Sequence, residues 1–333
     1  MSRGAPAPQL GSCTTKRWYN GGMNAPRTLA ARFTATLPLL AVVLTSACAR
    51  KPPAVDAAYR AEIAAWRAAR LAALTAPDGW LTLVGLFWLQ PGENRFGADP
   101  GNVVVLPGAG IAAVAGTLDL RPDGTVVLDP RPGAGVTVDG KPAAARPLRS
   151  DRAGSPDVVA LATYRFYVID RAGKLAVRVK DAASAARTQF KGIGHFPLDP
   201  AYRVTGTYEP YPAPREVKVA THQGPSQTML APGVVRFSLG GRRLALEPFV
   251  SSPADRTFFF VFRDTTSGHE TYGAGRFLDA EAPPPGSRAV VLDFNKATNP
   301  PCAFTPFATC PLPPPGNELP IRVTAGERYG GSH

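Results

Sequence analysis

Short runs of Val, Leu, Phe and Tyr, separated by glycine and proline turns, recur from about residue 80 to the end of the chain. The 33 glycines and 36 prolines make up about a fifth of the 333 residues, and this composition argues against a helical bundle. Runs of this length and spacing are typical of β-sandwiches and barrels. We therefore predict a mainly β fold with two sandwich-like or barrel-like units.

The apolar runs and their turn residues give the expected strand positions. In the first half of the chain we expect strands at Val103–Leu106, Thr117–Leu120, Thr125–Leu128, Gly135–Val138, Arg165–Ile169 and Leu175–Val179. In the second half we expect them at Tyr202–Tyr208, Val234–Leu239, Arg243–Leu246, Thr257–Phe262, Ala289–Phe294 and Ile321–Ala325. Asp123-Gly124 and Asp139-Gly140 are dipeptides that favour hairpin turns.

One helix is expected before the first strand. Asp56 can cap a helix that runs to about Leu74, where Pro77-Asp78-Gly79 would end it. Its expected buried face holds side chains spaced three and four residues apart, namely Tyr59, Ile63, Trp66, Arg70 and Leu74.

The first 47 residues have the features of an export signal. From Met23, which we expect to be the true start, the chain has two arginines and then the mostly apolar run Phe33–Ala47. Such a run is too short to anchor a helix across the hydrocarbon core of a bilayer. The next residue is Cys48, and Thr45-Ser46-Ala47-Cys48 resembles a bacterial lipobox, although a leucine is usual where Thr45 stands.

By that resemblance, Cys48 would be acylated and would become the mature N-terminus. Several acyl chains anchor a protein stably to a membrane without a transmembrane helix. Ala49 stands where an aspartate often retains such lipoproteins in the inner membrane. We therefore expect an exported protein anchored in the cell envelope, at the outer membrane and facing the periplasm. The alternative is simple secretion, in which Cys48 has no part in anchoring.

The net charge of +12 falls once the signal is set aside. Residues 1–47 hold five basic and no acidic residues, so 37 − 5 = 32 basic residues remain against 25 acidic ones, a charge of +7. No basic run is longer than two residues, whereas a nucleic-acid-binding face needs a basic stripe. We expect the membrane and an envelope ligand or protein as partners, and no nucleic acid.

The order of elements from Leu89 to about Lys180 is similar to that of a forkhead-associated (FHA) sandwich. The resemblance is carried by Asn94–Asp99, Asn102–Leu106 and Gly135–Gly140. Where that family has the arginine, serine and histidine that grip a phosphothreonine, this chain has Ala98, Ala112 and Ala115. The resemblance implies the scaffold without its binding activity.

Four further segments, at residues 79–89, 270–278, 293–302 and 310–317, resemble the DUF1684 family. The resemblance extends over nearly all of residues 57–329. Since the function of that family is unknown, the resemblance implies kinship and supplies no reaction. The expected organisation is a signal peptide (1–47), a lipid-anchored tether (48–55), a helix with connector (56–88), an FHA-like sandwich (89–182) and a C-terminal β domain with a Cys-Pro-rich segment (190–329).

No common catalytic signature occurs: the chain lacks a Gly-x-Ser-x-Gly elbow, a His-Glu-x-x-His helix and a phosphate loop. Cys302 and Cys310 are the cysteines that remain after Cys13 and Cys48. In an oxidising compartment we expect them to form a disulfide. Free thiols and a metal site are the alternatives, but a metal would need two more ligands. We expect no metal and no cofactor.

Polar residues of two neighbourhoods are candidates for a binding pocket. Glu270, Tyr272 and Arg276 would share one face of a strand, because their spacing is even. The other candidates follow an apolar strand or lie where the two units join, and they are Asp293, Asn295, Asn299, Lys180 and Arg187. Lys191 lies in the same junction, where clefts are common. The interpretation that we favour over a pocket is a buried structural network, in which Arg276 pairs with Glu270 or Asp293 and the asparagines bond turn backbone. We expect His195 and His269 on exposed loops.

These observations favour an envelope lipoprotein that binds a polar ligand or an envelope protein and is not an enzyme. One alternative is a hydrolase or transferase that uses Glu270 or Asp293 as acid and base in a cleft of the C-terminal domain. Another is a scaffold subunit of an envelope complex, which would expose a large apolar patch.

Overall fold

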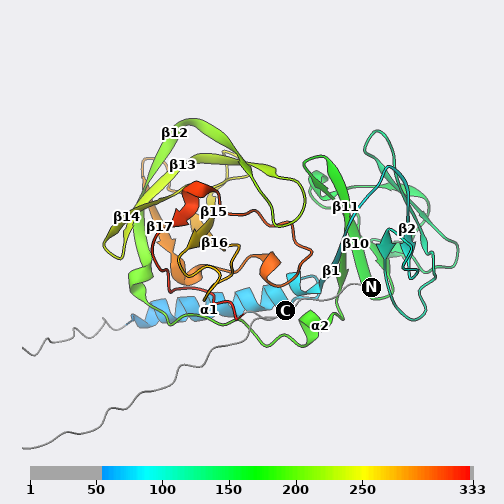
Figure 1. The fold of residues 1–333 in the computed structure, drawn as a ribbon, viewed down its shortest axis with the longest axis horizontal. Coiled ribbons are helices and arrows are strands. Elements are labelled where there is room, and N and C mark those ends of the chain that lie inside the picture. The colour runs from blue at the N-terminus through cyan, green and yellow to red at the C-terminus, as the bar shows by residue number, and fades with distance from the viewer. Residues whose placement is uncertain (1–54, 331–333) are drawn as a thin grey trace, which may run out of the picture. The chain divides into compact units, whose positions relative to one another are not determined.

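A computed structural model describes residues 55–330, so the signal segment and Cys48 lie outside the described residues. The predicted helix is confirmed as α1 (Ala57–Thr75), and the side chain of Asp56 caps it by accepting a hydrogen bond from the amide of Tyr59 at 3.3 Å. Tyr59, Ile63 and Leu74 are buried on the expected face. The mainly β fold is confirmed as well, since four sheets follow the helix (Figure 1).

The strands of residues 83–181 form two of these sheets. The six-stranded sheet has the order β1-β11-β10-β9-β6-β7, with β1 (Leu83–Trp88), β6 (Thr137–Val138), β7 (Lys141–Pro142), β9 (Val159–Leu161), β10 (Tyr164–Arg171) and β11 (Lys174–Asp181). The five-stranded sheet has the order β3-β2-β4-β5-β8, with β2 (Gly92–Gly97), β3 (Val104–Val105), β4 (Gly116–Leu120), β5 (Val126–Pro130) and β8 (Arg146–Leu148).

Both of these sheets contribute side chains to one hydrophobic core. Phe96 of β2 packs edge to face on Phe166 of β10, with ring centroids 5.4 Å apart. The two sheets therefore form the sandwich expected for this part of the chain.

The strands of residues 203–319 form the other two sheets. The four-stranded sheet has the order β14-β13-β12-β17, with β12 (Arg203–Val219), β13 (Gln227–Leu239), β14 (Arg242–Leu246) and β17 (Ala289–Asp293). The three-stranded sheet has the order β16-β15-β18, with β15 (Thr257–Asp264), β16 (Arg276–Glu281) and β18 (Glu318–Leu319). They share a second core, in which Phe237 of β13 and Phe262 of β15 both contact Phe294.

Short helices connect the strands. They are the 3-10 turns η1 (Trp80–Thr82), η2 (Asp151–Ala153), η3 (Pro200–Tyr202), η4 (Phe294–Lys296), η5 (Pro301–Ala303) and η6 (Pro315–Asn317), and the single α-turn α2 (Ala185–Thr188). In Figure 1, α1 runs alongside the sheets of the C-terminal half. The described residues belong to one compact unit, Pro53–His333, and the domain boundaries given above stay a prediction.

Strand β12 is far longer than the predicted Tyr208 limit, because the proline-rich segment after it does not end the strand. The pairing with β13 shifts register between Pro210 and Arg215 and then resumes through Val219. The irregularity accommodates residues that lack an amide hydrogen for the ladder.

The strand predicted at Ile321–Ala325 is not formed, and the prediction was wrong there. The amide of Val323 donates to the carboxylate of Asp264, and the carbonyls of Val323 and Ala325 accept from the guanidinium of Arg276. Buried side chains thus take up the backbone groups that a sheet neighbour would have used.

Candidate functional site

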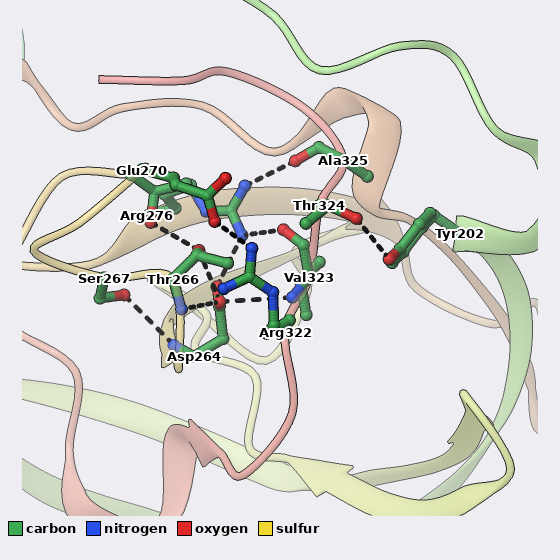
Figure 2. A network of polar contacts seen from close by, with 11 residues as sticks. Tyr202, Asp264, Thr266, Ser267, Glu270, Arg276, Arg322, Val323, Thr324 and Ala325 are labelled. Carbon is green, nitrogen blue, oxygen red and sulfur yellow. Dashed lines mark hydrogen bonds and ion pairs between the residues drawn. The ribbon is translucent and has the colours of Figure 1, made fainter. Parts of the chain in front are cut away.

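The eight polar residues expected to form one pocket are distributed over several separate contacts. Arg276 is fully buried, and its Nη2 lies 2.6 Å from Oδ2 of Asp264 (Figure 2). Its Nη1 and Nη2 also donate to the carbonyls of Ala325 and Val323, at 2.6 and 2.9 Å. Arg276 therefore belongs to a structural network, and its acidic partner is Asp264 rather than Glu270 or Asp293.

Glu270 and Tyr272 do not share a strand face with Arg276, and that prediction was wrong. The chain turns tightly before β16, because the amides of Glu270 and Thr271 both donate to the carbonyl of Thr266. The side chain of Glu270 instead pairs with Arg322 (Figure 2). The hydroxyl of Tyr272 donates to the carbonyl of Cys302 at 2.8 Å, and burial raises the pKa of this tyrosine, so the phenol stays protonated.

Asp293 and Asn295 attach α1 to the end of β17. The hydroxyl of Tyr59 donates to Oδ1 of Asp293 at 2.8 Å and accepts from Nδ2 of Asn295 at 3.0 Å. Oδ1 of Asn295 accepts from the amide of Asp199 at 3.2 Å. Burial and the Asp293 carboxylate raise the pKa of Tyr59. The polar groups of this cluster are thus engaged with one another.

Lys180 and Arg187 bind backbone carbonyls near the C-terminal end of α1. The ammonium of Lys180 donates to the carbonyl of Asp78 at 2.5 Å. Nε of Arg187 donates to the carbonyl of Thr75 at 2.8 Å, and Nη1 donates to that of Ala182 at 2.9 Å. Cations that bind the last carbonyls of a helix stabilise its end.

Cys302 and Cys310 lie side by side as buried thiols, and the predicted disulfide is not formed in this structure. The amide nitrogen of Cys302 is 3.2 Å from Sγ of Cys310. Leu83 of β1 and Ala308 pack against the pair. The two side chains thus meet as the sequence led us to expect, and their oxidation stays a prediction.

A pocket of about 1090 Å³ adjoins this segment. Four stretches of chain line it, at residues 81–84, 184–195, 299–307 and 328–330. Its apolar wall includes Leu81, Leu83, Phe190, Ile193, Phe304 and Phe307. The rings of Phe190 and Phe304 meet edge to face, with centroids 6.0 Å apart. A concave site of this size with mostly apolar walls suits a small ligand.

Asn299 is the one predicted pocket residue that lines this site, and it is only 2% exposed. Its Nδ2 donates to the carbonyl of Arg328 at 3.0 Å, which fixes the orientation of the amide. Its Oδ1 is buried and has no hydrogen-bond partner. A buried acceptor without a partner is costly, so the site is suited to a donor that comes from outside the chain.

Glu327 holds Asn299 in place through the backbone amide of Asn299. Its carboxylate accepts from the amide of Asn299 at 2.6 Å and from Nε of Arg70 at 2.9 Å, and it is fully buried. Arg70 also donates to the carbonyl of Asn299 at 2.9 Å. Helix α1 therefore positions the polar part of the pocket through Arg70.

His195 supplies a second acceptor, although we expected it on an exposed loop. It forms an antiparallel bridge with Glu327, and its Nε2 is buried without a partner. The carbonyl of Ile193 accepts a hydrogen bond from the ring, which assigns the proton to Nδ1. Burial, followed by the charges of Arg67 and Arg70, lowers the pKa of His195 to about 4. At neutral pH the ring is uncharged, and Nε2 is an acceptor.

The mouth of the pocket is basic. Lys191 and Arg328 line it and are exposed, whereas none of its lining residues is acidic. The guanidinium of Arg328 stacks on Phe196, 5.3 Å from the ring centroid. No ion pair in the part of the chain that the structure describes includes either residue. An anionic group at the mouth would therefore meet two available cations.

Two hydroxyl groups of the lining are already engaged. Oγ of Ser184 donates to the carbonyl of Leu81 at 2.7 Å, and Oγ1 of Thr305 donates to that of Leu83 at 2.9 Å. Neither is hydrogen-bonded to His195, whereas activation of a serine or threonine nucleophile requires such a base. Both hydroxyls are therefore committed to the backbone of η1 and β1.

Residues 55–330 contain no group of three or more His, Cys, Asp or Glu side chains that would hold a metal ion. Nor does any helix among them have the length and apolar character needed to cross a membrane.

Comparison with known proteins gives the relationship of the C-terminal half. Residues 188–328 match the protein family described as "Protein of unknown function (DUF1684)". This part of the chain is a DUF1684 domain. No curated protein matches the chain. A solution NMR structure of an uncharacterised protein from Haloarcula marismortui is 35% identical, covers 44% of this chain and 81% of its own, and has a TM-score of 0.39.

The DUF1684 domain supplies most of the pocket, including both buried acceptors. Residues 81–84, 184–186 and 329–330 complete the wall from outside the matched region. The sequence indicated the junction and Asn299, but it did not single out His195 or Glu327. A histidine directly after Gly192-Ile193-Gly194 was the available signal, whereas a lone glutamate near the end of the described residues gave none.

Proposed function

We propose that this chain is a lipid-anchored protein of the bacterial cell envelope whose DUF1684 domain binds a small ligand in the pocket at His195 and Asn299. The observation that carries the proposal is the pair of buried acceptors, Oδ1 of Asn299 and Nε2 of His195, which have no hydrogen-bond partner among residues 55–330. Unsatisfied groups in a well-formed pocket are expected where a ligand completes the hydrogen bonding.

Two alternatives have less support. The acid-base hydrolase would need a carboxylate in a cleft, but Glu270 pairs with Arg322, Asp293 accepts from Tyr59, and neither lines the pocket. The scaffold subunit would need a large exposed apolar patch. Among residues 55–330, the large hydrophobic side chains that are exposed are Leu71 and Val291, which come from different elements.

A library screen by ligand-observed NMR tests the binding function. Ala186 lines the pocket and is exposed, so Ala186→Trp would fill the mouth without disturbing the core. Ala183→Trp is the matched control, because Ala183 is exposed and does not line the pocket. We expect ligands that bind the unaltered chain and Ala183→Trp but not Ala186→Trp. Equal binding to all three proteins would refute the pocket as the site.

The envelope location rests on the signal segment and on the lipobox-like residues before Cys48. When it is expressed in a Gram-negative host, the unaltered chain should incorporate labelled palmitate and fractionate with the outer membrane. Cys48→Ala should take up no label. Label on the Cys48→Ala variant, or none on the unaltered chain, would overturn this part of the proposal.

A further inference from the structure

We infer that the ligand of this pocket is an amphiphilic anion whose apolar chain carries hydroxyl groups. This inference rests on the proposed binding function and names the class of ligand. Three features of the pocket carry it: the chemistry of its walls, the hydrogen-bonding capacity of its buried polar atoms, and the charge at its mouth.

The walls require a ligand with an apolar body. Leu83, Ile193 and three phenylalanines face a space of about 1090 Å³, at the upper end of the volumes that drug-sized ligands occupy. A sugar or a small polar metabolite would leave much of that apolar surface unfilled. A hydrocarbon chain of moderate length fills it and gains about 0.8 kcal/mol for each buried CH₂ group.

The buried polar atoms require a ligand that donates hydrogen bonds. Asn299 presents Oδ1 without a partner, while one N–H of its Nδ2 is held by the carbonyl of Arg328, and His195 presents only the lone pair of Nε2. A carboxylate or phosphate oxygen would meet these acceptors with no hydrogen to share. The donor must therefore be a group such as a hydroxyl.

The charges near the acceptors disfavour an ammonium group as that donor. Arg67, which has no acidic partner among the described residues, lies close enough to His195 to lower its pKa, and the pocket lining holds no carboxylate to balance a further cation. A neutral hydroxyl avoids this repulsion. The cations at the mouth, Lys191 and Arg328, then fit an anionic end group.

The test measures dissociation constants on the full chain by titration calorimetry with a matched pair of ligands. The hydroxyl of 3-hydroxydecanoate can donate, whereas the ether oxygen of 3-methoxydecanoate cannot, and both have the same chain and charge. We expect the hydroxy acid to bind at least about tenfold more tightly, the effect of one hydrogen bond to a buried acceptor. Its methyl ester, which lacks the anion, should bind a few-fold more weakly than the acid.

Three variants show whether the preference arises at the proposed atoms. His195→Phe and Asn299→Leu should each reduce the tenfold preference for the hydroxyl toward one, and His269→Phe, which changes an exposed histidine outside the pocket, should leave it intact. The comparison of the two ligands on the unaltered chain needs no variant and stands even if one fails to fold.

The outcomes separate this inference from the binding function. Equal affinities for the two acids, both abolished by Ala186→Trp, would overturn the hydroxyl inference and leave the pocket function standing. Binding of both that survives Ala186→Trp would overturn the pocket function itself. If neither acid binds, the inference fails, and the library screen alone decides the function.

Discussion

Arg70, in the helix that opens the described chain, forms an ion pair with the fully buried carboxylate of Glu327, with 2.9 Å between Nε and Oε1. The same carboxylate accepts from the amide of Asn299, so this pair fixes the backbone that presents the pocket acceptor. The contact joins two ends of the described chain at the candidate site.

Removing the charge of Glu327 should therefore destabilise the fold and weaken the pocket. Glu327→Gln leaves the guanidinium of Arg70 without its counter-ion, and we expect a loss of about 3 kcal/mol in the free energy of unfolding. Urea denaturation measures it. Glu209→Gln breaks an exposed pair with Arg236 and serves as the control, with an expected loss below about 1 kcal/mol. Equal losses in the two variants would contradict the structural role of Glu327.

The Asp264–Arg276 pair should be a second point of strong stabilisation. Arg276→Met would leave the Asp264 carboxylate buried and would free the carbonyls of Val323 and Ala325, at a cost of about 4 kcal/mol. Arg263→Met changes the same residue type at an exposed position and should cost less than about 1 kcal/mol. Chemical denaturation of both variants tests this, and a cost for Arg276→Met as small as that of the control would refute it.

His195 should make stability depend on pH in a definite direction. Its pKa is lowered from 6.5 to about 4 in the folded chain, so between these values the unfolded chain binds the proton and the folded chain does not. The contribution of the neutral ring is complete above pH 6.5 and is lost as the pH falls toward 4. Melting temperatures between these limits should fall less steeply for His195→Gln than for the unaltered chain. His269→Gln should follow the unaltered chain. If melting temperature depends on pH with the same slope in His195→Gln as in the unaltered chain, the pKa of His195 is not lowered by folding.

Oxidation of Cys302 and Cys310 should follow export. In a Cys48→Ala background, we expect the non-reduced mass to be lower by two hydrogen atoms than the mass after reduction, since the two cysteines already meet. Closing so short a loop should stabilise the fold by roughly 2.5 kcal/mol. A mass that reduction does not change would contradict the disulfide, and Cys302→Ser provides the reduced reference.

Local sequence patterns predicted the elements whose backbone hydrogen bonds follow a regular helix or strand pattern. The cap at Asp56 and the spacing of Tyr59, Ile63 and Leu74 gave the bounds of α1 within one residue. Strand β15 follows directly from its phenylalanine run. These features depend on neighbours in the sequence, so a pattern can show them.

The site depended on contacts that no local pattern records. Arg276 pairs with Asp264, rather than with either predicted partner, because the antiparallel pairing of β15 and β16 brings the two residues together. His195 became a buried acceptor because residues 326–328 pair with its backbone. The alternating apolar residues Ile321, Val323 and Ala325 suggested a strand, yet the carbonyls of Val323 and Ala325 accept from a guanidinium more than forty residues earlier in the chain.

The contacts of α1 bear on the order in which the chain assembles. Tyr59 contacts Asp293 across 234 positions and Arg70 contacts Glu327 across 257, so α1 finds its partners far along the described chain. Contacts of such long sequence separation slow folding, because a large loop must close before they form. During synthesis, the apolar face of α1 would stay uncovered until residues 293–327 have been made. The pocket, whose Asn299 is held by Arg70 and Glu327, is thus complete only after the chain through Glu327 has been made.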